Sequence, residues 1–344
     1  GGLVISDKPD KSGKPDKAKG RRQGPRKVSA GYLERAALHY LGRFSTTEAN
    51  LRAVLERKIR RRNEENAPPT DEQLGWVDAV VAKCVSYGYV DDATYARSRV
   101  DTLTFNRPEK KNALTQAMYG AAADAINAAQ DNKNVRVILL TGAGDAFTAG
   151  NDIADFAGAG SAPREGEPPV ARYLKAILYC EKPLIAAVNG LAIGVGVTML
   201  LHCDLVYAGE TATFQTPFVN LGLVPEAASS LLLPRAIGTQ KANEMFLLGR
   251  KVGAEEAERI GLAAATVPDA ELMKTARAAA SALAAKAPGA VKATKKLARG
   301  ELAEIAARMD AESKIFGAQL QTAEFAEAAS AFAEKRAPDF TKVA

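Results

Sequence analysis

Two short segments of small residues and one carboxylate have the residue types that chemistry at an oxygen atom requires. The segment AGND at 149–152 follows an apolar run, and Gly190–Gly196 contains three glycines. Small residues let the backbone approach a ligand closely, and two fixed backbone N–H groups in a dry pocket stabilise negative charge on an oxygen. Glycine-rich segments also simply shape turns. Glu226 precedes a helix expected over Ala227–Leu233, where a carboxylate can stabilise the helix N-terminus.

Cysteine and histidine supply no competing site. Cys84, Cys180 and Cys203 are widely spaced without a CxxC pair, and His39 and His202 are the two histidines of the chain. No metal-site spacing results, so we expect no metal and buried, reduced thiols. His202 and Cys203 are neighbours in an apolar stretch. We expect them on opposite sides of a strand, which rules out a Cys–His nucleophilic pair.

Alternating strands and helices surround these segments. β-branched apolar runs predict strands at Leu103–Phe105, Val135–Thr141, Leu184–Val188 and Leu205–Ala208, and an Ala-rich helix is expected over Thr115–Gln130. This alternation is typical of βαβ units and an α/β fold. Residues 254–344 have Ala, Glu and Lys at helical spacing and read as nearly all helical.

The first hundred residues differ in charge and texture. They hold 20 of the 46 Lys and Arg residues but 13 of the 40 Asp and Glu residues, so they carry a net +7 and the remainder a net −1. Residues 1–30 are rich in Lys, Arg, Gly, Pro and Ser, which predicts a disordered basic tail. Such a tail can hold nucleic acid loosely through phosphate contacts, although a solvated tail without a specific partner is the commoner case.

Residues 31–100 read as a small all-α module. Apolar residues recur at helical spacing after Tyr32, and the second helix is expected to begin with Ser45 as its N-cap. A third helix is expected around Trp76–Tyr87 with Gly88 at its C-terminal end, and Asp91-Asp92 would open another.

Six segments in order resemble the crotonase superfamily over about 103–344: NRPEKKNAL (106–114), AFTAGNDI (146–153), KPLIAAVNGLAIGVG (182–196), CDLVYAGETATFQTPF (203–218), LGLVPEAASSLLLPRAIG (221–238) and AFAEKRAPDF (331–340). The resemblance implies an α/β fold with a crotonase-like ββα superhelix core over 101–270. A helical C-terminal region over 271–344 would mediate assembly into trimers or hexamers.

The same resemblance implies acyl-CoA chemistry. The backbone N–H groups of Asn151 and Val195 would form an oxyanion hole for an enolate. Substrate and CoA contacts would come from a further set of residues: Lys110, Lys111, Ala149, Gly150, Asp152, Ile153 and Gly194. No cofactor is needed beyond the CoA that the substrate carries.

Two departures from the enoyl-CoA hydratase pattern narrow the expected reaction. Positions that carry glutamates in those hydratases hold Thr198 and Phe218 here. Hydration needs one group to activate water and another to manage the α proton, so efficient hydration is not expected. Glu226 instead resembles the catalytic glutamate in the P-E-G/A-x-S-S turn of monofunctional Δ3,Δ2-enoyl-CoA isomerases. That resemblance implies an isomerase with Glu226 as its acid and base and with a raised pKa. Another crotonase reaction, such as hydration or thioester hydrolysis, is the alternative.

Residues 31–100 resemble the N-terminal repeat of RecX-type regulators of RecA, most distinctively in GYVDDATYAR at 88–97. One unit and the start of a second are present where those proteins have several. A regulator that binds RecA or DNA is therefore the alternative from another functional class. The basic residues from Arg57 to Arg62 favour that alternative and the missing repeats oppose it.

The junction near 101–104 raises a structural question. The crotonase fold usually begins with a β-hairpin, and the RecX-like segment stands where its first strand should be, as in a gene fusion. We therefore expect a sheet edge that is left open. The chain has no apolar run of about 20 residues and no secretory signal at its start, so we expect a cytoplasmic protein without a membrane span.

Overall fold

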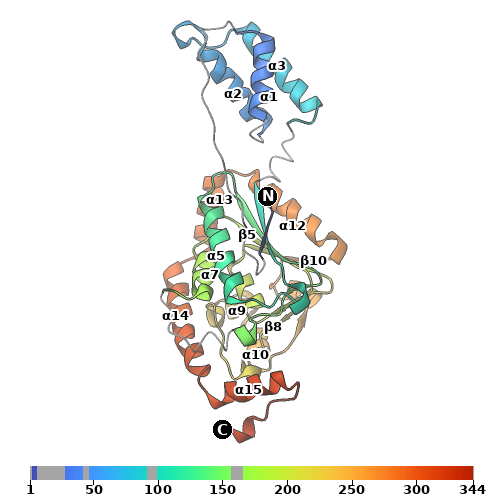
Figure 1. Cartoon of the computed structure of the whole chain (residues 1–344), viewed down its shortest axis with the longest axis vertical. Coiled ribbons are helices and arrows are strands. Elements are labelled where there is room, and N and C mark those ends of the chain that lie inside the picture. The colour runs from blue at the N-terminus through green and yellow to red at the C-terminus, as the bar shows by residue number, and fades with distance from the viewer. Residues whose placement is uncertain (1, 6–27, 42–45, 91–98, 156–165, 344) are drawn as a thin grey trace. The chain divides into compact units, whose positions relative to one another are not determined.

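The computed structural model describes residues 2–5, 28–41, 46–90, 99–155 and 166–343. The chain divides into two compact units, residues 9–98 and residues 1–8 together with 99–344. The C-terminal helices therefore lie in the same unit as the strands of the core. The two units are described separately below (Figure 1).

Two sheets form the scaffold of the larger unit. In the described residues the first sheet is parallel and runs in the order β1 (Gly2–Ile5), β2 (Val100–Phe105), β3 (Val137–Gly142), β5 (Leu184–Val188), β7 (Leu205–Gly209) and β10 (Ala265–Val267). The second runs in the order β4 (Ala146–Thr148), β6 (Leu191–Ile193), β8 (Thr213–Gln215) and β9 (Val252–Gly253), with β9 antiparallel.

The chain alternates between these sheets. Each of β3, β5 and β7 in the first sheet is followed at once by β4, β6 or β8 in the second. Helix α5 (Gln116–Asp131) precedes the first of these strand pairs, and α7 (Pro169–Leu178) lies between the first and the second. Helix α8 (Val195–Thr198) and the 3₁₀ turn η3 (Met199–His202) lie between the second and the third. This is the predicted ββα superhelix. The predicted strand Leu184–Val188 matches β5, and the predicted helix Thr115–Gln130 matches α5 with Thr115 as its N-cap.

The first sheet is buried on both faces because its strands are apolar at successive positions. Leu103, Ile138 and Leu140 face the main core with α5 and α7. Val137, Leu139 and Ile185 face a second core with α12 (Asp269–Ala284). Figure 1 shows α5 and α7 on one side of this sheet and α12 on the other.

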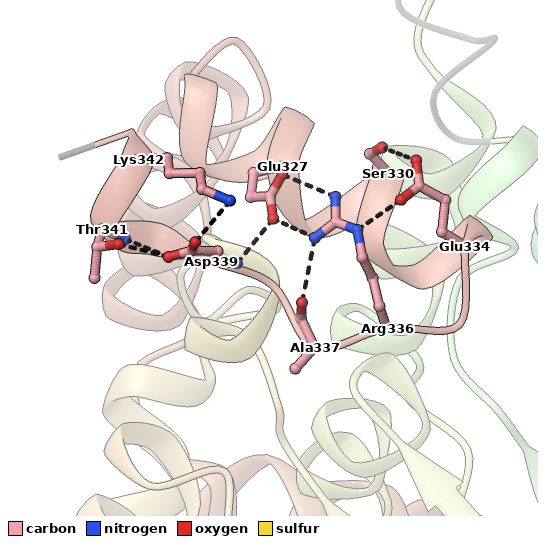
Figure 2. A network of polar contacts seen from close by, with 8 residues as sticks. All are labelled: Glu327, Ser330, Glu334, Arg336, Ala337, Asp339, Thr341 and Lys342. Atoms are coloured by element: carbon pink, nitrogen blue, oxygen red, sulfur yellow. Dashed lines mark hydrogen bonds and ion pairs between the residues drawn. The ribbon is translucent and has the colours of Figure 1, made fainter.

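Helices complete the C-terminal part, as predicted. They are α9 (Ser229–Ile237), α10 (Thr239–Leu247), α11 (Ala254–Arg259), α12, α13 (Pro288–Arg299), α14 (Leu302–Gln319) and α15 (Ala323–Ala333). Helix α14 packs against α9. Arg336 pairs with Glu327 of α15 and with Glu334, and the backbone N–H of Asp339 donates to Glu327 over 2.8 Å (Figure 2). The Arg336 hydrogen bond lowers the pKa of Glu327 to about 2, and the network fastens the segment after α15 to that helix.

In its described residues the smaller unit contains the helices α1 (Ala30–Leu41), α2 (Glu48–Arg60) and α3 (Asp71–Ser86). Their apolar faces share one core around Leu33, Leu55 and Val81. The N-cap of α2 is Thr47, whose hydroxyl accepts the N–H of Asn50, so the prediction of Ser45 as that N-cap was wrong. Helix α3 begins earlier than predicted because Thr70 and Gln73 form a capping box.

The ends of the smaller unit bear on two further predictions. Gly88 follows α3 with φ of +69°, as expected for a glycine that ends a helix. The helix expected from Asp91-Asp92 lies outside the described residues.

Strand β1 corrects two predictions. The tail was expected to be disordered over residues 1–30, but Gly2–Ile5 forms a strand that pairs in parallel with β2, and α1 begins at Ala30. The remaining tail residues 6–27 lie outside the described ranges. The edge of β2 was expected to be open, but β1 covers it from Thr102 to Phe105. The prediction of disorder rested on the basic composition of the whole tail and overlooked the short apolar run LVI at its start.

Candidate active site

Parallel pairing brings the two segments of small residues together. Strand β4 pairs in parallel with β6 so that Thr148 lies opposite Ala192, and the carboxyl ends of both strands lie at the same side of the second sheet. Gly150 has φ of +88°, and a Cβ atom there would lie 2.8 Å from the carbonyl oxygen of Ile193. A side chain would push the two segments apart, so this position requires glycine.

Each segment presents a backbone amide at this edge. Within the described ranges, the N–H groups of Asn151 and Val195 donate no hydrogen bond to another residue. The neighbouring amides are engaged, because Asp152 N–H donates to Leu114 O over 3.0 Å and Gly194 N–H donates to Gln215 O over 2.8 Å. The backbone is therefore fixed while both predicted donors remain available to a ligand.

A buried tyrosine holds the side chain of Asn151. The Tyr119 hydroxyl, from α5, donates to Asn151 Oδ1 over 2.5 Å. Burial first, and then the nearby Glu226 and Tyr173, raise the pKa of Tyr119 well above its ordinary value, so the hydroxyl keeps its proton. The sequence analysis missed Tyr119. The helical spacing of α5 predicts that its side chain is buried but not what it contacts.

Glu226 lies against the short helix that begins at Val195. The Thr198 hydroxyl donates to Glu226 Oε1 over 2.5 Å, and Thr198 itself is fully buried. Burial raises the pKa of Glu226 to about 7, the Thr198 hydrogen bond opposes that rise, and the charge of Glu312 adds to it. A carboxyl group with this pKa exchanges its proton readily near neutral pH.

Glu226 does not act as the N-cap of the following helix. That helix, α9, begins at Ser229 rather than Ala227, and its N-cap residue is Ala228 with φ of +58°. The carboxylate that accepts the Ala228 N–H, over 2.5 Å, belongs to Glu312 of α14. The capping interpretation of Glu226 was therefore wrong, because a residue distant in sequence takes that place.

Thr198 and Phe218 occupy the positions where the hydratase pattern has glutamates. Phe218 is buried in the main core, and its ring lies 3.9 Å from the point where a Cβ atom of Gly194 would be. Thr198 reaches Glu226 from one turn of helix beyond the Val195 amide. Neither Thr198 nor Phe218 carries a carboxyl group, and the carboxyl group that Thr198 contacts is that of Glu226.

The comparisons with known proteins now decide the family. The family model described as enoyl-CoA hydratase/isomerase matches residues 96–343. The chain belongs to the enoyl-CoA hydratase/isomerase family.

Individual relatives agree with this assignment. A probable enoyl-CoA hydratase of Rhodobacter capsulatus is 39% identical over 244 residues, covering 70% of this chain and 93% of that protein. Enoyl-CoA delta isomerase 2 of Rattus norvegicus is 38% identical over 174 residues, which is 49% of this chain and 44% of that protein. A crystal structure of an enoyl-CoA hydratase/isomerase from Pseudoalteromonas atlantica T6c is 50% identical, with a TM-score of 0.67, covering 71% of this chain and 96% of that one.

The family match covers only part of the chain. It begins after α3, so helices α1–α3 lie outside it. The likeness of those helices to RecX-type regulators, the binding of RecA or DNA, the gene fusion and the trimeric or hexameric assembly stay predictions. No helix in the described ranges is both long and apolar enough to cross a membrane.

The residues predicted to contact CoA lie near the Asn151 amide. Ala149 N–H donates to Lys111 O over 2.8 Å, and the Lys111 ammonium pairs with Asp145 over 2.6 Å at an exposed position. Lys110 is exposed in the same turn. Gly150 follows β4 and Gly194 follows β6, and Ile153 lies in the helical turn after Asp152.

The carboxylate of Asp152 is paired with another side chain. It pairs with Arg107 over 2.6 Å, with both side chains mostly buried. Burial raises the pKa of Asp152, but the hydrogen bond and charge of Arg107, together with the N–H groups of Asp155 and Ala154, outweigh burial and lower it overall. Asp152 also accepts the N–H groups of Ala154 and Asp155. It therefore shapes the segment that carries the Asn151 amide.

The buried thiol and imidazole do not form a nucleophilic pair, as predicted, but for another reason. His202 ends η3 and Cys203 follows it, so neither lies in a strand. His202 Nε2 lies 2.8 Å from the carbonyl oxygen of Ala227, and burial raises the pKa of the Cys203 thiol to about 12. A thiol with that pKa is protonated and unreactive at neutral pH. The described residues contain no cluster of metal-binding side chains.

Proposed function

We propose that this protein is a Δ3,Δ2-enoyl-CoA isomerase in which Glu226 is the single acid and base. The observation that carries the proposal is the 2.5 Å hydrogen bond from Thr198 to Glu226. It ties one carboxyl group to Thr198, which stands at one of the two positions where the hydratase pattern has a glutamate. A 1,3-shift of a proton needs one such group, whereas hydration needs two.

The reaction would proceed in two proton transfers. The Glu226 carboxylate takes a proton from C2 of a 3-enoyl-CoA, and the electron pair of that C–H bond moves into the thioester to form a dienolate. The N–H groups of Asn151 and Val195 donate to the negatively charged oxygen. Glu226, now protonated, returns the proton to C4, and the double bond comes to lie between C2 and C3.

The pKa of about 7 suits both steps. A carboxylate with a much higher pKa would take the proton and not return it, and a carboxylate with a much lower pKa would not remove the proton from C2. Burial that raises the pKa therefore makes one carboxyl group serviceable as base and then as acid. CoA itself would be held by Lys110, Lys111 and the backbone of Ala149–Ile153.

The test measures isomerisation of a 3-enoyl-CoA to the conjugated 2-enoyl-CoA with the intact chain, Glu226→Gln and Glu304→Gln. The control residue Glu304 lies on the exposed face of α14 in a pair with Arg235. We expect Glu226→Gln to lose about a thousandfold in kcat and Glu304→Gln to retain full activity. Rapid hydration of a 2-enoyl-CoA by the intact chain, with no isomerisation, would refute the proposal in favour of a hydratase.

A further inference from the structure

The backbone that carries Glu226 is held in an unfavourable conformation. Ala227 and Ala228 follow Glu226 with φ of +60° and +58°, a region that residues with a side chain seldom adopt, and both are buried. Two consecutive residues of this kind persist only where their surroundings fix them. The turn Glu226–Ala228 must therefore be held by contacts from other elements.

One contact comes from the segment that also bonds the Glu226 carboxyl. His202 Nε2 lies 2.8 Å from the carbonyl oxygen of Ala227. Burial lowers the pKa of His202 to about 4, so the ring is neutral at neutral pH and its Nε2–H donates to that carbonyl. Thr198, four residues earlier, bonds the side chain of the same turn. This segment therefore holds both the carboxyl group and the backbone of Glu226–Ala228.

The second contact comes from the C-terminal helix α14. Glu312 Oε2 accepts the N–H of Ala228 over 2.5 Å, and Oε1 accepts the N–H of Ser230 over 2.9 Å as well as the Ser230 hydroxyl. Glu312 is buried, which raises its pKa, and the hydrogen bonds from Ser230 and Ala228 oppose that rise by stabilising its ionised form. Ala228 has no side-chain acceptor of its own, so Glu312 caps α9 from outside.

We propose that Glu312 is a positioning residue for Glu226. Its carboxylate fixes the backbone from Ala228 to Ser230, and thereby the Glu226 carboxyl against Thr198. Its negative charge adds to the effect of burial, so that Glu226 holds its proton more tightly. This role rests on the proposed function of Glu226 as the acid and base, and it makes α14 part of the machinery behind the active site.

The other groups near Glu226 leave this electrostatic coupling intact at neutral pH. Burial keeps the phenols of Tyr119 on α5 and Tyr173 on α7 neutral, since both pKa values are raised well above the ordinary value. His202 is neutral. Burial raises the pKa of Glu312, and its hydrogen bonds with Ser230 and Ala228 and the charge of Arg308, one turn before it on α14, oppose that rise. Glu226 and Glu312 are thus the two carboxyl groups whose charges interact across the turn.

The test replaces Glu312 by glutamine, with Glu304→Gln on the same helix as the matched control. Glutamine has one acceptor oxygen in place of two and no charge, so the turn loosens and Glu226 loses a neighbouring anion. We expect kcat for isomerisation to fall about tenfold with KM within about twofold. The acid limb of kcat/KM, set by Glu226, should move to lower pH by about half a unit or more.

A second readout separates this proposal from the proposed function. The infrared C=O band of protonated Glu226, identified by its loss in Glu226→Gln, titrates with the pKa of that group whether or not the enzyme turns over. A midpoint near 7 in the intact chain and a lower midpoint in Glu312→Gln support the positioning role even if isomerisation is absent. An unchanged midpoint, with kcat unchanged, overturns it and leaves the isomerase assignment standing.

If Glu312→Gln fails to fold, Ser230→Ala takes its place. This variant keeps the backbone N–H groups and removes the hydroxyl that bonds Glu312 and lowers its pKa. Glu312 is then protonated over more of the neutral range, so the Glu226 midpoint should fall in the same direction by a smaller amount. A rise or no change in that midpoint overturns the proposal.

Discussion

Replacing Glu226 with glutamine should stabilise the folded protein at alkaline pH while abolishing its activity. Burial raises the pKa of Glu226 from an ordinary 4.5 to about 7. The folded state therefore binds this proton more tightly than the unfolded state, and folding loses stability as pH rises from about 4.5 through 7. Glutamine is isosteric, accepts the same Thr198 hydrogen bond and carries no charge to desolvate.

The size of the effect follows from the pKa difference. Each unit corresponds to about 1.4 kcal/mol, so a difference of about 2.5 units gives an upper limit of roughly 3 kcal/mol above pH 8. Glu226 keeps partial contact with solvent, which reduces the expected gain to about 2 kcal/mol. For a unit of this size that is a rise in Tm of about 4–8 °C.

The assay is urea or thermal unfolding of the intact chain and Glu226→Gln at pH 5 and pH 8.5. The stability advantage of glutamine should grow by about 2 kcal/mol between the two values, because at pH 5 the glutamate is already protonated in the folded state. Glu304→Gln, which breaks an exposed ion pair with Arg235, should change stability by less than about 0.5 kcal/mol at both pH values.

An advantage that is equal at both pH values, or a loss of stability at pH 8.5, would refute the reasoning. Either result would mean that the Glu226 carboxyl is solvated or fully compensated in the folded state. It would then have an ordinary pKa, and it would lack the weak acidity that the second proton transfer requires. A gain in stability on removal of the proposed base would instead identify this carboxyl as one whose burial is costly and is retained for function.

Three further substitutions test the parts around Glu226. Thr198→Val removes the hydrogen bond that lowers the pKa of the proposed base, so the acid limb of the pH profile should move up by about one unit, with about tenfold less activity at pH 7. Gly150→Ala places a Cβ atom 2.8 Å from a carbonyl oxygen of β6 and should lower kcat about a hundredfold. Lys295→Met removes the buried ammonium that donates to Asp204 over 2.6 Å, while Leu184 N–H still donates to that partly exposed carboxylate, and should cost about 1.5 kcal/mol in urea unfolding.

Each of these three predictions has an outcome that would contradict it. Gly253→Ala, with no atom within 4 Å of the added Cβ, should behave as the intact chain, so equal losses at both glycines would exclude a local effect on the amides. A downward shift of the acid limb in Thr198→Val would contradict the direction of the hydrogen-bond effect. Unchanged stability in Lys295→Met would show that the Asp204 carboxylate is solvated.

Sequence reasoning identified the parts of this site that depend on local pattern. Apolar runs predicted the strands, and the small residues at Gly150 and Gly194 predicted close backbone approach. It did not predict the contacts that join distant elements. Thr198 was considered only for the reaction it excludes, although its hydroxyl bonds Glu226 across 28 residues of sequence. No local signal connects Glu312 with the turn at Ala228, which lies 84 residues before it.

The predicted helix N-caps were wrong in two cases: one where two suitable residues are close in sequence, and one where the cap comes from a distant helix. Ser45 and Thr47 are both good N-cap residues, and the position of Asn50 relative to Thr47 decides between them only once the helix is formed. Glu226 precedes a helix and is acidic, which made it a plausible cap. The positive φ values at Ala227 and Ala228 turn its side chain toward Thr198 instead, and alanine gives no sign of such a conformation in a sequence.

The residues proposed to form the site all belong to the larger unit. The residues that assemble the site run from Tyr119 on α5 to Glu312 on α14, and none belongs to α1–α3. The larger unit takes one element from before the module, β1, whose backbone pairs with β2 at the edge of the first sheet. β2 in turn pairs with β3, and β3 leads directly into β4, which ends at the Asn151 segment. The N-terminal residues Gly2–Ile5 therefore extend the first sheet, which leads through β3 into the second sheet, where β4 ends just before the Asn151 segment.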